Sequence, residues 1–394
     1  MRVMYVQYAG DFAEAYDRLY TNNGEENYYG QCYSVKTVVD QARKGLEVSV
    51  LTTLVDNDYE RVLERNLTAS GIDKATSQRH KQTFQKIEEF NPDRVVLRMP
   101  DWRILKFLRK KKISVFPVFA DSFDEKVGVR SWIKQKILTR ELCAAHIKWV
   151  ANHQINASKS LLNLGLQPGC VLPYDWEHDD NPDNWTPHVN PNLTTSTIQL
   201  FFAGNLTEKK GVFDIVKAVS HITNKGRSVD LRIAGTGDEK KIVSIAQSLD
   251  IEENIKLLGN ITHKQVLAEM NIADVVIVPS HHSYPEGLPM TIMESMLVQT
   301  PLVVSDHPMF VGRLPASGAV EFFEEKRSDQ LAEKVLMICH DLELYRARSE
   351  DAKECWGQLT LKLKWADMIN NWLSNNNSIL NTHSLSSILN LKSF

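Results

Sequence analysis

The sequence lacks the cysteine patterns that bind metals or cross-link small folds. Its five cysteines are an odd number spread along 394 residues, and no Cys-x-x-Cys pair or Cys/His cluster with metal-ligand spacing occurs. Disulfide bonds and a structural zinc site are therefore not expected. The five positions are Cys32, Cys143, Cys170, Cys339 and Cys355.

Long hydrophobic runs are also missing. No stretch of about 18 apolar residues, the length that crosses a membrane, occurs anywhere in the sequence. Residues 1–6 enter a strand-like segment directly, without the apolar region that a signal peptide carries. We therefore expect a cytoplasmic protein.

The sequence has little excess charge overall. The net charge of −3 argues against nucleic acid as a partner. Residues 98–148 are nevertheless basic, with 13 Lys and Arg against 5 Asp and Glu. Within this segment, residues 102–112 combine an apolar helical stripe with a basic remainder. Such a helix either contacts an anionic membrane surface peripherally or crosses over a sheet with its basic face in water.

The length predicts two domains, because 394 residues exceed the usual size of one hydrophobic core. The composition, 43% hydrophobic and 24% charged, is that of an ordinary globular protein. Strand-like runs alternate with helical segments in both halves, which is typical of doubly wound α/β domains. The predicted organisation is a Rossmann-like domain over 1–174, a polar linker over 175–197, a second Rossmann-like domain over 198–355, a helix within 356–375 and a mobile or loosely docked tail over 376–394.

The most informative segment is residues 275–296, where a buried strand ends in a loop that turns into a helix. Pro289 suits the first turn of that helix, because its fixed φ fits and its missing N–H costs nothing there. Free amides and the positive end of the helix dipole then predict an anion site suited to a diphosphate. These amides belong to Gly287, Leu288, Met290 and Thr291.

Two carboxylates flank this predicted anion site. Glu286 precedes the turn and Glu294 lies on the helix, with seven residues between them. Carboxylates are poor partners for a diphosphate, but each can accept two hydrogen bonds from a vicinal diol on a sugar or a ribose. The arrangement therefore predicts a nucleotide-sugar site. The alternative is an amphipathic helix whose two glutamates are solvated.

The spacing of Glu286 and Glu294, in the context Pro-Glu-Gly-Leu-Pro-Met, resembles the Glu-x7-Glu motif of glycosyltransferase family 4. The members of that family are retaining enzymes with the GT-B fold. The resemblance implies that Glu286 binds hydroxyls of the donor sugar and that Glu294 binds the ribose. It also implies two Rossmann-like doubly wound domains that face each other across a cleft, with the C-terminal helix crossing back to the first domain.

A second element, residues 203–211, resembles the family's Gly-Arg-Leu-x-x-x-Lys-Gly loop and begins with Gly204. Lys210 matches the diphosphate-binding lysine, whose ammonium would offset the charge that builds on the departing nucleoside diphosphate. Asn205 stands where the family has arginine, and Lys209 is the candidate that replaces it. The other interpretation is an ordinary exposed basic loop.

Two further loops complete the resemblance in the second half. Gly235 belongs to an Ala-Gly-x-Gly sequence like the family's, and Asn260 and Ile261 occupy the place where the family binds the base. Taken singly, each loop is a weak signal, because a short glycine loop is more often just a tight turn. All four elements follow the family's order along the chain, and that order is the stronger evidence.

The first half matches the family less well. Gly30 lies after the first strand, where the family has a glycine-rich loop that touches the donor phosphate and the acceptor. Ala120 stands where many relatives have a histidine that contacts the donor sugar. Asp121, next in sequence, is therefore a candidate for contacting sugar or acceptor. The plain alternatives are a loop glycine for Gly30 and a turn or helix-capping residue for Asp121.

Together these features imply a retaining hexosyltransferase. It would move a hexose from a nucleoside diphosphate sugar, such as UDP-glucose, to a hydroxyl of a saccharide or lipid-linked acceptor in polysaccharide or glycolipid synthesis. Glu286, Lys210 and Asp121 are the expected catalytic residues. Neither a cofactor nor a metal is expected, because residues 56–58, Asp-Asn-Asp, have no diphosphate loop beside them.

Two alternatives use the same fold. A non-catalytic nucleotide-sugar binding protein would explain the missing arginine and histidine. A GT-B epimerase that acts on the sugar nucleotide would need an acid/base pair near the sugar, and the sequence offers no identifiable one.

Overall fold

The structure is a computed structural model that describes the chain except residues 9, 23, 27–29, 124–128, 316–317 and 391–394. These gaps remove part of the predicted membrane segment 98–148 and the end of the predicted tail from the described residues. By its contacts the chain divides into two compact units. One unit contains Met1–Glu177 and Leu361–Phe394, and the other contains His178–Thr360.

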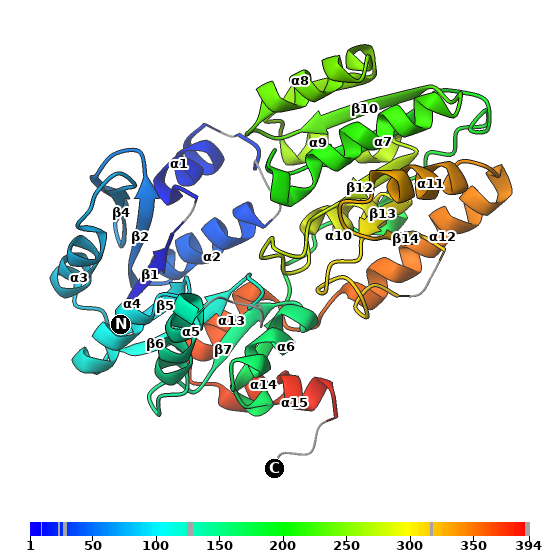
Figure 1. Ribbon diagram of the computed structural model, residues 1–394. Helices are drawn as coiled ribbons and strands as arrows, with labels where there is room; N and C mark the ends of the chain where they lie inside the picture. The colour runs from blue at the N-terminus through cyan, green and yellow to red at the C-terminus, as the bar shows by residue number, and fades with distance from the viewer. Residues whose placement is uncertain (9, 23, 27–29, 124–128, 316–317, 391–394) are drawn as a thin grey trace. The chain divides into compact units, whose positions relative to one another are not determined.

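The first unit is built on an eight-stranded sheet of order β3-β4-β2-β1-β5-β6-β7-β8. All neighbours are parallel except β3, which runs antiparallel to β4 at the edge. Figure 1 labels most of these strands along the blue to green part of the chain. The strands are β1 (Arg2–Gln7), β2 (Glu47–Val55), β3 (Tyr59–Glu64), β4 (Leu67–Asp73), β5 (Arg94–Arg98), β6 (Ser114–Phe119), β7 (Val150–His153) and β8 (Val171–Tyr174).

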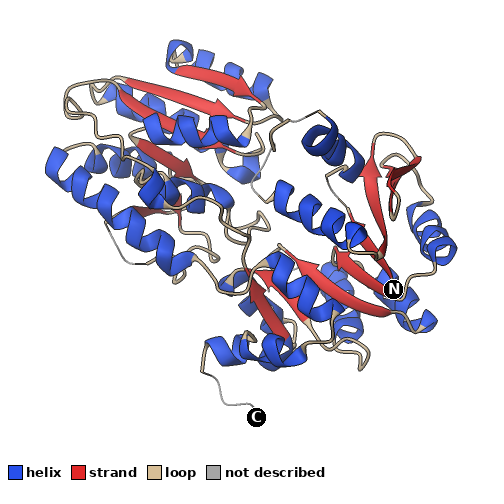
Figure 2. Cartoon of the chain, turned by 180° about the vertical axis from the view of Figure 1, so that it is seen from behind, coloured by secondary structure: helices blue, strands red, loops and turns tan. Residues whose placement is uncertain are grey.

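Helices flank this sheet, as Figure 2 shows from behind. The strands read as continuous apolar runs, such as Val95, Val96 and Leu97, because a parallel sheet is buried on both faces. The helices are α1 (Phe12–Tyr16), a π-helical turn (Asp17–Thr21), α2 (Gln31–Arg43), α3 (Arg79–Phe90), α4 (Trp102–Lys111), α5 (Val129–Leu142), α6 (Ile155–Asn163), a 3-10 turn (Pro168–Cys170), α13 (Trp365–Leu373), α14 (Asn377–Thr382) and α15 (Leu385–Ile388).

The last segment of the chain packs on the first unit. The Trp365 and Trp176 rings are stacked with centroids 5.6 Å apart, and buried Asp175 accepts hydrogen bonds from the Leu361 amide and from Lys364 Nζ. Residues 376–394 differ from the prediction of a loosely docked tail. Among those described, 377–382 and 385–388 are helical, and Leu385 is fully buried against the core of the first unit.

The second unit has a six-stranded parallel sheet of order β11-β10-β9-β12-β13-β14. Its strands are β9 (Ile198–Ala203), β10 (Val229–Ala234), β11 (Ile255–Gly259), β12 (Val275–Val278), β13 (Leu302–Ser305) and β14 (Val320–Phe323). Its helices are α7 (Val212–Asn224), α8 (Glu239–Ser248), α9 (His263–Ile272), α10 (Met290–Leu297), α11 (Ser328–Ile338) and α12 (Leu342–Leu359), with 3-10 turns at Pro182–Asn184, Glu208–Lys210 and Glu252–Asn254.

Alternate residues of the second sheet face two separate cores. Leu200 and Phe202 pack with α7, α8 and α11 on one side, whereas Phe201 packs with α9, α10 and α12 on the other. The segment predicted as a linker, 175–197, is not separate from the units: residues 175–177 belong to the first unit and residues 178–197 to the second. Leu193 is buried in its core, and Gln299 Nε2 donates to the carbonyl oxygens of Pro182 and Trp185.

Both sheets contain a point where the strand order reverses. In the first sheet this point lies between the neighbours β1 and β5. The strands that follow β1 are added on one side of it, and those that follow β5 are added on the other. In the second sheet the same reversal separates β9 from β12. Ligands of doubly wound sheets bind beside the carboxyl ends of the strands at such points. Each unit therefore has one place where a ligand is expected.

Candidate functional site

The predicted donor-binding residues other than Gly30 belong to the second unit and lie on loops beside the reversal point of its sheet. The loop after β9 contains Gly204 and ends at Gly211, and the loop after β12 runs from Pro279 to Pro289. Gly211 has φ +77° and lies so close to Pro279 that a Cβ atom would clash with its carbonyl oxygen. His281 N also donates to Lys209 O at 2.9 Å. The glycine and this hydrogen bond hold the two loops against each other.

Lys210 and Glu286 form a buried ion pair at this junction. A Cβ atom on Gly204 would lie 3.1 Å from Lys210 Cε, so the glycine leaves room for the lysine side chain. Ser280 Oγ donates to the same Glu286 oxygen at 2.6 Å, and the Lys210 ammonium lies 4.9 Å from the Tyr284 ring centroid. The structure therefore brings together two of the three predicted catalytic residues, which are 76 positions apart.

Beside this pair, the N-terminus of α10 presents the four predicted amides. Within the described part of the chain, no acceptor bonds the amides of Gly287, Leu288, Met290 and Thr291. Thr291 Oγ1 is likewise buried without a partner among the described residues. Pro289 immediately precedes the helix rather than lying in its first turn. Unpaired donors at a helix N-terminus suit an anion.

Glu294, the second acid of the motif, is buried on α10. His263, the first residue of α9, places its Nε2 2.9 Å from Glu294 Oε1. A carboxylate with a single close partner keeps acceptor capacity for further hydroxyl groups. Sequence reasoning missed His263, because nothing in its local sequence links it to a glutamate on another helix.

The remaining predicted donor contacts lie on neighbouring loops. Asn205 is exposed and donates from Nδ2 to Tyr284 Oη at 3.3 Å, and the exposed Lys209 side chain has no hydrogen-bond or ion-pair partner among the described residues. A Cβ atom on Gly235 would overlap the Gly204 carbonyl oxygen, so the loop after β10 lies against the loop after β9. Asn260 and Ile261 follow β11 directly, with Asn260 exposed and Ile261 partly buried.

A histidine–carboxylate pair joins the loop after β12 to the first turn of α7. His281 Nε2 lies 2.6 Å from Asp214 Oδ2 in the first turn of α7, and both side chains are buried. His307 Nε2 lies 3.0 Å from Tyr284 O, and burial lowers the pKa of this histidine. The histidine doublet before Glu286 was visible in the sequence. Its partner Asp214, 67 positions earlier, was not.

Gly30 and Asp121 belong to the first unit. Gly30 immediately precedes α2 with φ +85°, and a Cβ atom there would lie 2.7 Å from Trp176 Cδ2. Asp121 follows β6, its carbonyl oxygen accepts from Asn152 Nδ2 at 2.8 Å, and burial raises the pKa of its carboxyl. The side chain of Asp121 has no hydrogen-bond or ion-pair partner among the described residues.

The basic segment 98–148 divides into two different helices. Ile104, Leu105 and Leu108 of α4 are buried in the core of the first unit, so its apolar stripe covers the sheet, as the crossover interpretation has it. On α5, in contrast, Trp132 and Ile133 are 52% and 48% exposed.

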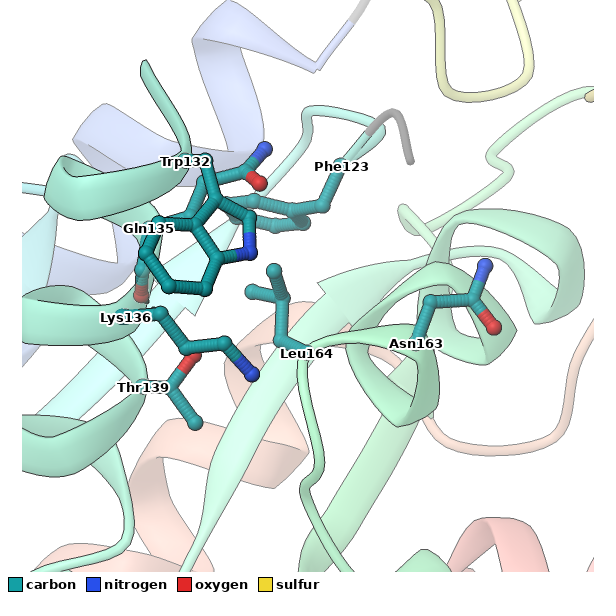
Figure 3. A pocket seen from close by; sticks show the side chains of 7 residues that line it. All are labelled: Phe123, Trp132, Gln135, Lys136, Thr139, Asn163 and Leu164. Atoms are coloured by element: carbon teal, nitrogen blue, oxygen red, sulfur yellow. Dashed lines mark hydrogen bonds between the residues drawn. The ribbon is translucent and has the colours of Figure 1, made fainter. Parts of the chain in front are cut away.

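A hollow of about 160 Å³ lies beside Trp132. Figure 3 shows Trp132, Gln135, Lys136 and Thr139 of α5 opposite Asn163 and Leu164. No residue of this hollow was among the predicted donor or catalytic residues. The described residues contain no group of three or more His, Cys, Asp or Glu side chains able to hold a metal, and no helix among them is long and apolar enough to span a bilayer.

The sequence matches known glycosyltransferases in its second half. The family model for "Glycosyl transferases group 1" matches residues 184–355. An amylovoran biosynthesis glycosyltransferase of Erwinia amylovora is 29% identical over 139 residues, which is 34% of this chain and 32% of that protein. A glycogen synthase of Mycobacterium tuberculosis is 29% identical over 113 residues, 28% of this chain and 27% of the relative. The alignments therefore span about a third of the curated relatives, and they support a relation to the group 1 enzymes.

Solved structures match nearly the whole chain. Sucrose-phosphate synthase from Thermosynechococcus elongatus has a TM-score of 0.70 at 13% identity and covers 96% of this chain and 99% of its own. HepE of Anabaena in complex with UDP-glucose has a TM-score of 0.63 at 13% identity, over 96% and 100%. WaaG, a glycosyltransferase of lipopolysaccharide biosynthesis, has a TM-score of 0.62 at 14% identity, over 94% and 99%. These likenesses confirm the predicted GT-B fold with its two Rossmann-like domains.

Proposed function

We propose that this chain is a retaining hexosyltransferase that uses a nucleoside diphosphate sugar. The observation that carries the proposal is the buried pair of Lys210 and Glu286 beside the amides that precede and open α10, which have no acceptor among the described residues. One side of this junction offers donors for a diphosphate, and the other offers a carboxylate for sugar hydroxyls. The relation of residues 184–355 to group 1 glycosyl transferases supports the same assignment.

In the proposed reaction, a hydroxyl oxygen of the acceptor forms a bond to the anomeric carbon on the face that the diphosphate leaves. The bond from that carbon to the diphosphate oxygen breaks, and the hydroxyl proton passes to the departing diphosphate. The Lys210 ammonium and the amides of Met290 and Thr291 stabilise the charge that develops on the diphosphate. Glu286 accepts hydrogen bonds from sugar hydroxyls and holds the anomeric carbon in place.

Glu294 is proposed to bind the ribose, with His263 orienting its carboxylate. Gly204, Asn205 and Lys209 would border the phosphates, and Gly235, Asn260 and Ile261 would border the nucleoside. Uridine is the proposed base and glucose the proposed sugar, since HepE, a structural neighbour, was solved with UDP-glucose. Asp121 is the proposed contact for the acceptor, and no metal is required.

The deciding experiment mixes the purified chain with labelled UDP-glucose, other nucleotide sugars and candidate saccharide or prenyl-linked acceptors. A nucleotide sugar that binds is first identified by thermal stabilisation of the protein. A ligand at 100 times its dissociation constant raises the free energy of unfolding by about 2.7 kcal/mol. Transfer that survives excess EDTA and retains the anomeric configuration supports the proposal. Binding without transfer or hydrolysis identifies a non-catalytic binder, and an altered sugar without acceptor identifies an epimerase.

We also propose a peripheral membrane contact through residues 98–148, in which α5 would touch the lipid surface. Exposed Trp132 and Ile133 lie beside the exposed lysines Lys134 and Lys136, a combination that suits an anionic lipid surface. Sedimentation with anionic and with neutral vesicles tests this contact. Binding to the anionic vesicles that is lost in Trp132→Ser supports it, and equal recovery of both proteins in the supernatant contradicts it.

A further inference from the structure

The first sheet has its own candidate ligand site at the reversal point between β1 and β5. Gln7 ends β1 and Arg98 ends β5, and the two residues are partners in the parallel register. Arg98 Nη1 donates to Gln7 Oε1 at 3.0 Å. This pair lies where the carboxyl ends of strands diverge, the position at which doubly wound sheets bind their ligands.

The Arg98 guanidinium is partly buried, yet its partners are neutral. Among the described residues it contacts, besides Gln7, the Trp365 ring, whose centroid lies 5.4 Å from the Arg98 Cζ atom. Among the described residues no carboxylate lies within 4.0 Å of it. Several other arginines of the unit, including Arg43, Arg61 and Arg109, pair with carboxylates. A partly buried cation without a counter-charge favours an anion.

The two phenols near Arg98 do not supply that counter-charge. Tyr5 and Tyr174 lie within electrostatic reach of the guanidinium, and burial raises the pKa of both phenols, so both stay neutral. Gln7 is fully engaged, because its Nε2 donates to Gly10 O at 2.6 Å. The guanidinium has five N–H donors, and one of them has an acceptor in the described chain.

We propose that Arg98 binds an anionic group of the acceptor, either a phosphate or a carboxylate. The inference rests on the proposed transferase function, in which the donor diphosphate occupies the junction of Lys210 with α10 in the other unit. An anion at Arg98 therefore belongs to the second substrate. The geometry of the guanidinium, a planar fork, suits the two oxygens of either group.

The test measures binding of small probes by calorimetry, without any donor present. Geranyl phosphate is compared with geraniol, and the methyl glycoside of glucuronic acid with that of glucose. At least one anionic probe is expected to bind about tenfold more tightly than its neutral counterpart. The pair that shows the difference identifies the source of the anion as a lipid-linked phosphate or an acidic sugar.

Three variants make the result specific. Arg98→Gln is expected to abolish the preference for the anionic probe, and Arg98→Lys to keep part of it because the charge remains. Arg94→Gln is the matched control, since Arg94 begins the same strand at its opposite end and donates to Trp372 O and Asn375. It is expected to keep the full preference. Thermal unfolding of each variant shows whether it is folded.

Two results would overturn the inference. One is equal binding of anionic and neutral probes by the wild-type chain. The other is displacement of the anionic probe by UDP, which would assign Arg98 to the donor phosphate. Neither result bears on the transferase function, which is decided separately by donor binding and sugar transfer in the wild-type chain.

Discussion

His281, on the loop after β12, contacts Asp214, in the first turn of α7, with 2.6 Å between Nε2 and Oδ2. The pair touches neither Lys210 nor Glu286 by its side chains in the described contacts, but His281 N donates to the carbonyl oxygen of Lys209. The pair therefore acts on the site indirectly, because it fixes the position of the loop that carries Lys209 and Lys210.

Replacing Asp214 by Asn should lower sugar transfer by about 10- to 100-fold, because small displacements of reacting groups have effects of this size. The loss should appear in kcat more than in the donor KM, as measured by initial rates over a donor series. His282→Ala is the control, since His282 is partly exposed and pairs with Asp306 instead. Equal losses of transfer in Asp214→Asn and His282→Ala would contradict a role specific to the pair of His281 and Asp214.

Removing either member of the Lys210 and Glu286 pair should both abolish activity and destabilise the fold. A broken buried pair costs about 3 to 5 kcal/mol, because one charge stays buried without its partner. The variant with both residues changed to Ala should lose less than the sum of the two single variants. Chemical denaturation measures these free energies of unfolding. Additive losses would show that the two charges do not interact.

Gly211→Ala should destabilise the second unit by more than a positive φ alone explains. Gly226 has a similar φ, +81°, with nothing within 4 Å of a Cβ atom, whereas a Cβ on Gly211 would clash with Pro279 O. Gly226→Ala should cost about 1 kcal/mol, and Gly211→Ala distinctly more. Thermal unfolding of the two variants is the measurement, and similar shifts in both would argue against the close approach of the loops.

Asp121→Asn should stabilise the folded chain at neutral pH while reducing transfer. Burial raises the pKa of the Asp121 carboxyl in the folded state, so the charged form is disfavoured there. Folding therefore loses stability as the pH rises from the unfolded value of about 3.9 through the folded value, and the Asn variant avoids this loss. Unfolding at pH 4 and pH 7.5 should show a gain at the higher pH, and a gain of the same size at both would contradict the assignment.

Leu385→Ala should lower the stability of the first unit by about 2 to 5 kcal/mol, as for other leucines in closed cores. Leu385 is fully buried, and Ile388 on the same helix is 36% exposed. Ile388→Ala should therefore cost much less. Chemical denaturation of the two variants compares them directly, and a neutral Leu385→Ala would mean that α15 does not contribute to the core.

The local sequence was enough to predict the strand and loop that carry Glu286, because Val275–Val278 is a short apolar run followed by Pro and Gly signals. It was not enough to predict the partners of the site. His263 reaches Glu294 and Asp214 reaches His281 only through packing between different helices and loops. The tail was predicted to be loosely docked because its composition is polar, whereas its apolar residues Leu380 and Leu385 are fully buried.

The division of the first unit into two chain segments affects the order of folding during synthesis. Residues 178–360 form an uninterrupted unit and emerge from the ribosome in one piece, so they can fold as soon as they are complete. The first sheet is translated earlier, but Tyr5 and Trp176 must wait for Trp365, which is translated only after the whole second unit. A nascent chain halted before residue 361 would therefore expose aromatic surface and be a target for chaperones.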